Sequence, residues 1–328
     1  MDHQNFAAGI ADIEAAAKRL SGQLVPTRLM ESESLNDRYN ARIFFKPECL
    51  QRTGSFKFRG AYNRISQFTP EEKERGIVAF SSGNHAQGVA SSARIFGIKA
   101  VIIMPSDAPQ VKVDNTRSYG AEVVFFDRYT ESRDVIAAPF IEERGMVLVP
   151  PYDDPSIIAG QGTIGLEIAD EAKERGITLD DVFVPSGGGG LISGVSIAVK
   201  ARSPQTRIWG VEPENFDDLR RSLVAGEIRS NETGYRSICD AILTAQPGDL
   251  TFPINRQNLA GGIAVSDIAV RKAMREAASH LKLVVEPGGS VGLAALASGE
   301  VDIKGKTVAV VLSGGNVDLD SFSKLIAS

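Results

Sequence analysis

The stretch 181–191 reads DVFVPSGGGGL, in which a run of strand-forming residues leads through Ser186 into four glycines and then into an apolar helical segment. The glycines are Gly187, Gly188, Gly189 and Gly190. Consecutive glycines expose backbone N–H groups, and the N-terminus of the following helix adds partial positive charge. Together these features predict an anion-binding loop, most naturally for phosphate. A merely flexible loop is the alternative, which the flanking strand and helix disfavour.

The order of strand, loop and helix in this stretch recurs along the chain. Apolar runs of strand length lie at 43–46, 77–80, 100–104, 122–126, 146–149, 181–185, 207–211 and 307–312. Helical spacing of apolar residues occurs between them at 86–96, 132–143, 157–173 and 268–281. The strands show almost no polar alternation, which is typical of parallel strands buried on both faces. We therefore predict an α/β protein with largely parallel sheets flanked by helices.

Glycines also mark the ends of four expected helices. Gly76, Gly97, Gly145 and Gly176 each follow a basic or aromatic residue and lead toward a strand. All four fit a left-handed conformation at the helix C-terminus.

Composition excludes several classes of protein. The 328 residues leave room for about two domains. A net charge of −5 argues against nucleic-acid binding, which depends on clustered Lys and Arg. No apolar run is long enough to cross a membrane and no signal peptide is visible, so we expect a cytoplasmic protein. Two cysteines and three scattered histidines do not suffice for a disulfide framework or a zinc site.

Two other motifs suggest rival chemistries. A dinucleotide-binding GxGxxG pattern begun at Gly188 would need glycine where Ser193 stands, although Glu212 ends the next strand where an acidic ribose ligand is expected. An NAD-dependent dehydrogenase therefore stays a remote alternative. The GGSVG at 288–292 matches the G-x-S-x-G of hydrolases, but no histidine follows Ser290, so that hypothesis fails on residue order.

The segment 53–60, TGSFKFRG, places Lys57 between two phenylalanines in the first turn of an expected helix, with Ser55 as the N-cap. The helix dipole and the apolar neighbours both favour the neutral amine. Lys57 is thus a candidate nucleophile for Schiff-base chemistry, and an ordinary exposed lysine is the alternative.

Polar corners at 81–85 (SSGNH) and 313–316 (SGGN) follow two other strands. Ligands gather at the carboxyl ends of parallel strands, so we expect these features to converge, unless the corners are only polar turns.

In this order, the motifs resemble those of the pyridoxal-phosphate enzymes of the tryptophan-synthase β type, or fold type II. Within that family the similarity is to serine/threonine dehydratases and serine racemases. The matching segments are SFKFRG, SSGNHAQG, PPYDDP with IAGQGTIGLE, SGGGGL and SGGNVD. The resemblance implies a large cofactor-binding domain made of residues 1–75 and 151–328, and a small substrate-binding domain made of residues 76–150. It also implies a homodimer.

The resemblance gives each motif a role. Lys57 resembles the lysine that carries the cofactor, and Phe56 the residue that packs on its ring. Asn84 resembles the partner of the ring's 3′-oxygen, and the glycines at 187–190 resemble the phosphate cup. Ser313 resembles the hydroxyl that faces the pyridine nitrogen. A serine there should leave that nitrogen largely unprotonated, which favours expulsion of a β-leaving group over prolonged carbanion storage.

The reaction that the resemblance implies is β-elimination by an L-serine/L-threonine ammonia-lyase, a dehydratase that yields a 2-oxo acid and ammonia. Lys57 would take the α-proton of a small β-hydroxy amino acid. The substrate carboxylate would bind at the corner formed by Ser81, Ser82, Gly83 and His85.

Several features leave the subgroup open between this activity, a serine racemase and a 3-hydroxyaspartate dehydratase. Ser82 replaces the alanine of simple threonine dehydratases, and in racemases a serine here resembles the acid/base on the opposite face of the cofactor. Arg133 resembles a position near the substrate that could pair with a second carboxylate, although a solvated helix arginine is the alternative. The segment Cys239-Asp240-Ala241 stands where much of the family has Ala-Asp-Gly, and we expect it near the substrate.

A divalent cation is the last implication. The loop 212–218, EPENFDD, resembles the cation loop of racemases, in which Glu212, the Phe216 carbonyl and Asp218 would supply oxygen ligands. Such ligands suit Mg²⁺ or Ca²⁺. A solvated acidic turn is the alternative.

Overall fold

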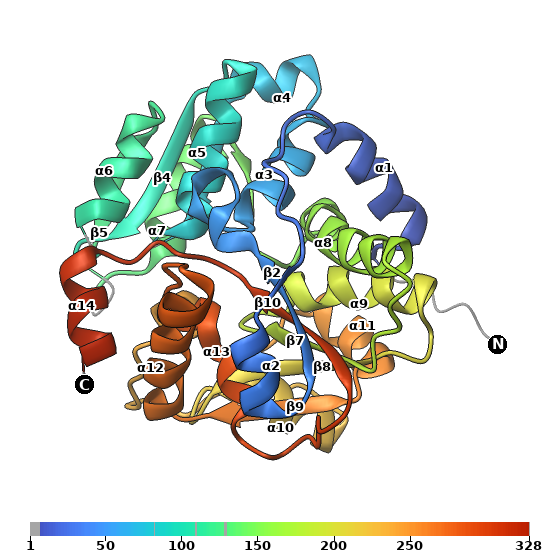
Figure 1. The fold of residues 1–328 in the computed structure, drawn as a ribbon. Helices are drawn as coiled ribbons and strands as arrows, with labels where there is room; N and C mark the ends of the chain where they lie inside the picture. The colour runs from blue at the N-terminus through green and yellow to red at the C-terminus, as the bar shows by residue number, and fades with distance from the viewer. Residues whose placement is uncertain (1–6, 82, 109, 128–129, 328) are drawn as a thin grey trace.

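The computed structural model describes residues 7–81, 83–108, 110–127 and 130–327, and its strands form two separate sheets (Figure 1). The larger sheet has six strands in the order β1-β2-β10-β7-β8-β9, and the smaller has four in the order β5-β4-β3-β6. Neighbouring strands run parallel, except that β1 is antiparallel to β2. The predicted α/β class with largely parallel sheets is confirmed.

The strands are β1 (Met30–Glu31), β2 (Arg42–Pro47), β3 (Ile77–Phe80), β4 (Ala100–Pro105), β5 (Glu122–Phe126), β6 (Val147–Leu148), β7 (Asp181–Pro185), β8 (Arg207–Pro213), β9 (Gly261–Val265) and β10 (Thr307–Leu312). The helices are α1 (Ile10–Leu20), α2 (Glu33–Tyr39), α3 (Lys57–Ile65), α4 (Pro70–Arg75), α5 (Asn84–Phe96), α6 (Gln110–Ser118), α7 (Arg133–Ala138), α8 (Pro155–Glu174), α9 (Gly190–Arg202), α10 (Asp218–Ala225), α11 (Thr251–Asn258), α12 (Asp267–Glu276), α13 (Pro287–Leu296) and α14 (Leu319–Ala327). None of these described helices is both long and apolar enough to cross a bilayer.

Strand β10 shows why the unbroken apolar runs predicted buried sheets. Its alternate residues Val308 and Val310 pack in one hydrophobic core, whereas Ala309 and Val311 pack in the core on the opposite face. Strand β4 of the smaller sheet divides its side chains between two cores in the same way. Both sheets are therefore covered on both faces by helices, as a parallel sheet requires.

Several expected elements differ in detail. Strand β9 has no counterpart among the predictions, because its first residues, Gly261 and Gly262, carry no apolar side chains. Two predicted helices, at 132–143 and 268–281, end early as α7 and α12 and continue as π-helical turns. Pro139 begins the first of these turns, where it cannot donate a helical hydrogen bond.

Three of the four helix-ending glycines behave as predicted. Gly97, Gly145 and Gly176 have φ between 63° and 68°. At Gly76 φ is also positive, at 89°, but ψ is −174°, so the left-handed helical conformation predicted there is wrong. Gly76 instead leads directly into β3. Its carbonyl already accepts from Val147 N of the neighbouring strand β6.

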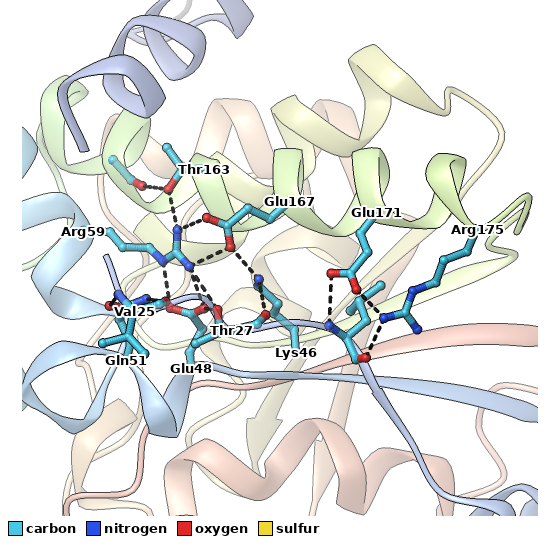
Figure 2. A network of polar contacts seen from close by, with 12 residues as sticks. Val25, Thr27, Lys46, Glu48, Gln51, Arg59, Thr163, Glu167, Glu171 and Arg175 are labelled. Atoms are coloured by element: carbon cyan, nitrogen blue, oxygen red, sulfur yellow. Dashed lines mark hydrogen bonds and ion pairs between the residues drawn. The ribbon is translucent and has the colours of Figure 1, made fainter. Parts of the chain in front are cut away.

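The N-terminus of α3 is fixed by a buried charge network (Figure 2). The Arg59 guanidinium donates to both carboxylate oxygens of Glu48, at 2.8 Å, and to those of Glu167, at 2.6 and 2.8 Å. Lys46 Nζ lies 2.5 Å from Glu167 Oε2 and 2.6 Å from the Thr27 carbonyl. The network joins β2, α3 and α8, and it therefore anchors the helix whose first residue is Lys57.

The two sheets bring their strand ends toward one region. Strands β3 of the smaller sheet and β7 and β10 of the larger one lead into the corner at 81–85, the glycine loop at 187–190 and the corner at 313–316. All four strands of the smaller sheet lie between residues 77 and 148, within the predicted small domain. The exact domain boundaries stay a prediction.

Candidate active site

A cavity of about 650 Å³ opens at these strand ends. Most of the predicted site residues line it, namely Phe56, Lys57, Ser81, Gly83, Asn84, His85, Gly187, Gly188, Gly189, Gly190 and Ser313. Ser82 lies outside the described residues, and of Arg133 only its place at the start of α7 is described. Glu212, Phe216 and Asp218 are not among the residues that line it.

Lys57 begins α3 and is half-buried. Its Nζ donates to the Pro151 carbonyl at 2.6 Å and lies 5.2 Å from the centre of the Phe56 ring. Burial lowers the pKa of the Lys57 amine to about 8, in the direction predicted from its neighbours. The predicted N-cap at Ser55 is wrong, because Phe56 precedes the helix and Ser55 is extended, pairing with Gly314 as an isolated bridge.

The loop at 187–190 requires glycine for steric reasons. Gly189 has φ of 95°, in the region that favours glycine, and a side chain at Gly188 would place its Cβ 2.3 Å from the Tyr152 ring. The Gly188 carbonyl accepts from Thr251 Oγ1 at 2.7 Å and from Gly248 N at 3.1 Å. These bonds hold the loop directly before the first turn of α9, whose N–H groups have no intrahelical acceptors. The loop is thus a cradle suited to a phosphate group.

His85 and Ser81 shape the corner after β3. His85 is buried, and its Nε2 lies 2.9 Å from the Val149 carbonyl, which can only accept. Burial, with the nearby charge of Lys57, lowers the pKa of His85 to about 3, so the ring is neutral. Its Nδ1 then has a free lone pair rather than a proton. Ser81 Oγ accepts from Gly83 N at 3.0 Å, which keeps the corner tightly turned.

Sequence reasoning missed two charged residues that line the cavity. Lys112 of α6 pairs with Asp240 at 2.8 Å and lies 3.9 Å from the carboxylate of Glu286. Burial raises the pKa of Glu286 to about 7, despite the opposing effect of Lys112. Sequence offered no signal for either residue: Lys112 looks like an ordinary surface lysine, and Glu286 looks like an ordinary residue before a helix that begins with proline. Asp240 and Ala241, in the segment expected near the substrate, do line the cavity.

The predicted cation loop holds two buried carboxylates. Glu212 lies in β8, directly before its last residue, and accepts from Leu219 N at 3.0 Å and Arg220 N at 2.9 Å. Asp218 Oδ1 accepts from Asn231 Nδ2 at 2.6 Å, whereas its Oδ2 is buried and has no hydrogen-bond partner among the residues that the structure describes. Burial raises the pKa of both carboxyl groups, that of Asp218 to about 7. The described ranges contain no group of three acidic, imidazole or thiol side chains placed to hold a metal ion, so a site here would need the Phe216 carbonyl as a ligand.

Fold and cavity together define an enzyme built to hold a phosphorylated, lysine-bound cofactor. The family model for pyridoxal-phosphate dependent enzymes matches residues 20–314, and the chain belongs to that family. The glycine cradle, the half-buried amine of Lys57 and the hydroxyl of Ser313 fit pyridoxal phosphate, which the structure does not contain.

Known proteins narrow the family further. The L-threo-3-hydroxyaspartate ammonia-lyase of a Pseudomonas species is 44% identical over 96% of this chain and 97% of its own length. The L-threonine ammonia-lyase of Thermotoga maritima is 42% identical over 97% of this chain and 78% of its own. The solved structure of maize serine racemase matches with a TM-score of 0.92 and 38% identity, over 98% of both chains. This chain is therefore a fold type II pyridoxal-phosphate enzyme of the serine/threonine dehydratase and serine racemase family.

Proposed function

We propose that this enzyme is an ammonia-lyase for L-β-hydroxy amino acids, with L-serine and L-threonine as substrates. The observation that carries the proposal is that Lys57, with its lowered pKa, lines the same cavity as the glycine loop and Ser313. A neutral hydroxyl at position 313, in place of an acid, favours elimination over long-lived carbanion chemistry.

The chain's own residues would perform the proton transfers. Bound pyridoxal phosphate supplies an electron sink next to the substrate Cα. Lys57, whose pKa of about 8 leaves part of the amine unprotonated near neutrality, takes the proton from Cα. N–H groups at the start of α5, with Ser81, bind the substrate carboxylate. The β-hydroxyl leaves as water by taking up the proton that Lys57 removed from Cα, and the released enamine hydrolyses to a 2-oxo acid and ammonia.

The test is a substrate panel in which 2-oxo acid and ammonia are both measured. The panel contains both enantiomers of serine and threonine, with Lys57→Ala as the inactive control. We expect one equivalent of each product from the L-enantiomers. Inversion of L-serine without release of ammonia would instead favour the racemase, in which Ser82 serves as the second acid/base.

The position of Lys112 favours L-threo-3-hydroxyaspartate as a second candidate substrate. Its amine is a nearly buried cation beside Gly83, where a second carboxylate could replace Asp240 as the partner. The variant Lys112→Met should then lose more activity toward 3-hydroxyaspartate than toward L-serine. The matched control is Asp240→Asn, which removes the carboxylate partner of Lys112 and should keep the activity toward 3-hydroxyaspartate. Arg133 stays a proposed partner of the same carboxylate, and Arg133→Met tests it in the same assay.

We further propose that Glu212, the Phe216 carbonyl and Asp218 bind Mg²⁺ or Ca²⁺. Two features support this: the buried Asp218 Oδ2, which has no partner in the described part of the chain, and an all-oxygen ligand set. Each ion bound only by the folded state stabilises it by mass action. Melting curves with Mg²⁺, Ca²⁺ or chelator should differ for the native protein and coincide for Asp218→Ala. Identical curves for the native protein would leave only a buried acidic turn.

We also propose that residues 76–150 form the small domain, that the enzyme is a homodimer and that it is cytoplasmic. Sedimentation of the holoenzyme tests the dimer, since a monomer at assay concentration would contradict it.

A further inference from the structure

Three side chains form a chain of hydrogen bonds beside the cavity, where the two sheets meet. Asn316, which follows β10, donates from Nδ2 to the Thr53 carbonyl at 2.8 Å and to Asn84 Oδ1 at 2.8 Å. Asn84, the first residue of α5, donates from its own Nδ2 to Glu286 Oε1 at 2.5 Å. Glu286 precedes α13, so the chain connects the larger sheet's loops to the helix that carries the corner after β3.

The backbone carbonyl sets the direction of every bond in this chain. A carbonyl only accepts, so Thr53 requires the amide nitrogen of Asn316 on its side. That nitrogen then faces the oxygen of the Asn84 amide, which leaves Nδ2 of Asn84 on the side of Glu286. A primary amide nitrogen carries two hydrogens, and Glu286 accepts one of them. Since Asn84 lines the cavity, its second N–H is the one available to a ligand.

Two glycines make room for this arrangement. A side chain at Gly314 would place its Cβ 2.2 Å from Glu286 Oε1, and one at Gly54 would place its Cβ 2.4 Å from Asn316 Oδ1. Glu286 is 2% exposed, and its Oε2 has no hydrogen-bond partner within the described part of the chain. The Glu286 carboxyl group therefore accepts its side-chain hydrogen bond from Asn84, whereas the Lys112 amine lies 3.9 Å away.

We propose that Glu286 and Asn316 are positioning residues that fix the Asn84 amide so that one N–H of Nδ2 points at the cofactor. The inference rests on the proposed function, in which Asn84 contacts the 3′-oxygen of the ring. It assigns to the buried carboxyl group a defined part in cofactor binding, which it exerts through the Asn84 amide.

A double-mutant cycle on cofactor affinity tests this inference. The dissociation constant of pyridoxal phosphate is measured by titrating the visible absorption band for Glu286→Ala and Glu286→Gln, each in the native and the Asn84→Ala background. One net hydrogen bond corresponds to roughly a tenfold change. We expect Glu286→Ala to raise the dissociation constant about tenfold in the native background and not at all in Asn84→Ala. Glu286→Gln keeps an acceptor oxygen and should stay within about threefold of native.

Asn316→Ala serves as an independent second variant, with the same expected weakening and the same dependence on Asn84. Equal weakening by Glu286→Ala in both backgrounds, or Glu286→Gln as weak as Glu286→Ala, would overturn the inference. Absence of any visible band in the native protein saturated with cofactor would refute the proposed function instead, so the two failures are distinguishable.

Discussion

Two regions of the molecule each hold two cations and two carboxylates, but they arrange them differently. In the network of Figure 2, Arg59 and Lys46 each lie within 2.8 Å of a carboxylate oxygen, and both carboxylates are paired. Among the described residues that line the cavity, Lys112 and Asp240 alone form an ion pair this short, at 2.8 Å. There, Lys57 donates to a backbone carbonyl, and Glu286 accepts from a neutral amide.

The pKa values follow the pairing. Burial raises the pKa of Glu167 in the network, but Arg59 and Lys46 outweigh it and bring that pKa to about 2. In the cavity, burial prevails and moves the pKa of Lys57 down to about 8 and that of Glu286 up to about 7. Paired charges thus stay ionised and structural, whereas underpaired groups are poised to exchange protons near neutral pH.

The largest effect should come from Lys57→Ala. Because Lys57 is both the cofactor anchor and the base, we expect the rate of 2-oxo acid formation to fall by at least about 10⁴-fold. The measurement is a coupled assay at saturating cofactor, with circular dichroism to show that the fold persists. Residual turnover above about one per cent of native would contradict the assignment.

Next in size is Arg59→Ala, which breaks the network. It leaves Glu48 and Glu167 without their guanidinium, and loss of one partner of a buried ion pair costs about 3–5 kcal/mol. Urea unfolding should show this loss of unfolding free energy. The control Arg59→Lys keeps the charge but not the two-pronged geometry, so it should fall between native and alanine. A loss below about 1 kcal/mol would mean that the network is not structural.

The two regions should change the free energy of unfolding in opposite directions as pH rises. Glu286 has a folded pKa of about 7 against an ordinary 4.5, so its stabilising contribution is present below pH 4.5 and is lost as pH rises through 7. Lys112, Asp240 and Asn84 are the groups that face it. Relative to Glu286→Gln, the native protein should lose about 3 kcal/mol of unfolding free energy across that window.

Glu167 should behave in the reverse sense. With a folded pKa of about 2, its contribution is present above pH 4.5 and is lost as pH falls toward 2. Urea unfolding of native protein, Glu286→Gln and Glu167→Gln at several pH values measures both slopes. Parallel slopes for the two variants would show that the regions do not differ as described.

Local sequence patterns predicted those parts of the fold that depend on a continuous run of apolar residues. Strand β10 is one example, since each of its faces meets a hydrophobic core. They failed at β9, where Gly261 and Gly262 pack beneath Trp209 and Arg220 without side chains of their own. The fit of a glycine against a residue from another strand or helix leaves no periodic signal in the sequence.

The residues of the site also fall into two groups, those that local sequence patterns predicted and those that they did not. The glycine loop, Lys57 and Ser313 were predictable because each directly follows a strand or begins a helix, where parallel sheets place ligands. Lys112 and Glu286 were not, because their proximity arises from tertiary packing between segments more than 170 residues apart in sequence, and neither has a distinctive neighbour. The two side chains come near each other only once the two sheets meet.

The smallest effect should come from Arg202, an exposed counterpart of Arg59. It also faces two carboxylates, Glu14 at 2.7 Å and Asp170 at 3.4 Å, but its side chain is 36% exposed and theirs are 46% and 53% exposed. Water and salt screen such pairs, and the side chains lose entropy in forming them, so Arg202→Ala should cost less than about 1 kcal/mol of unfolding free energy. The cost should shrink further in 1 M NaCl, where the screening length is about 3 Å, whereas that of Arg59→Ala should change little. If urea unfolding showed equal costs for the two arginines, burial would not be what separates a structural charge network from a surface one.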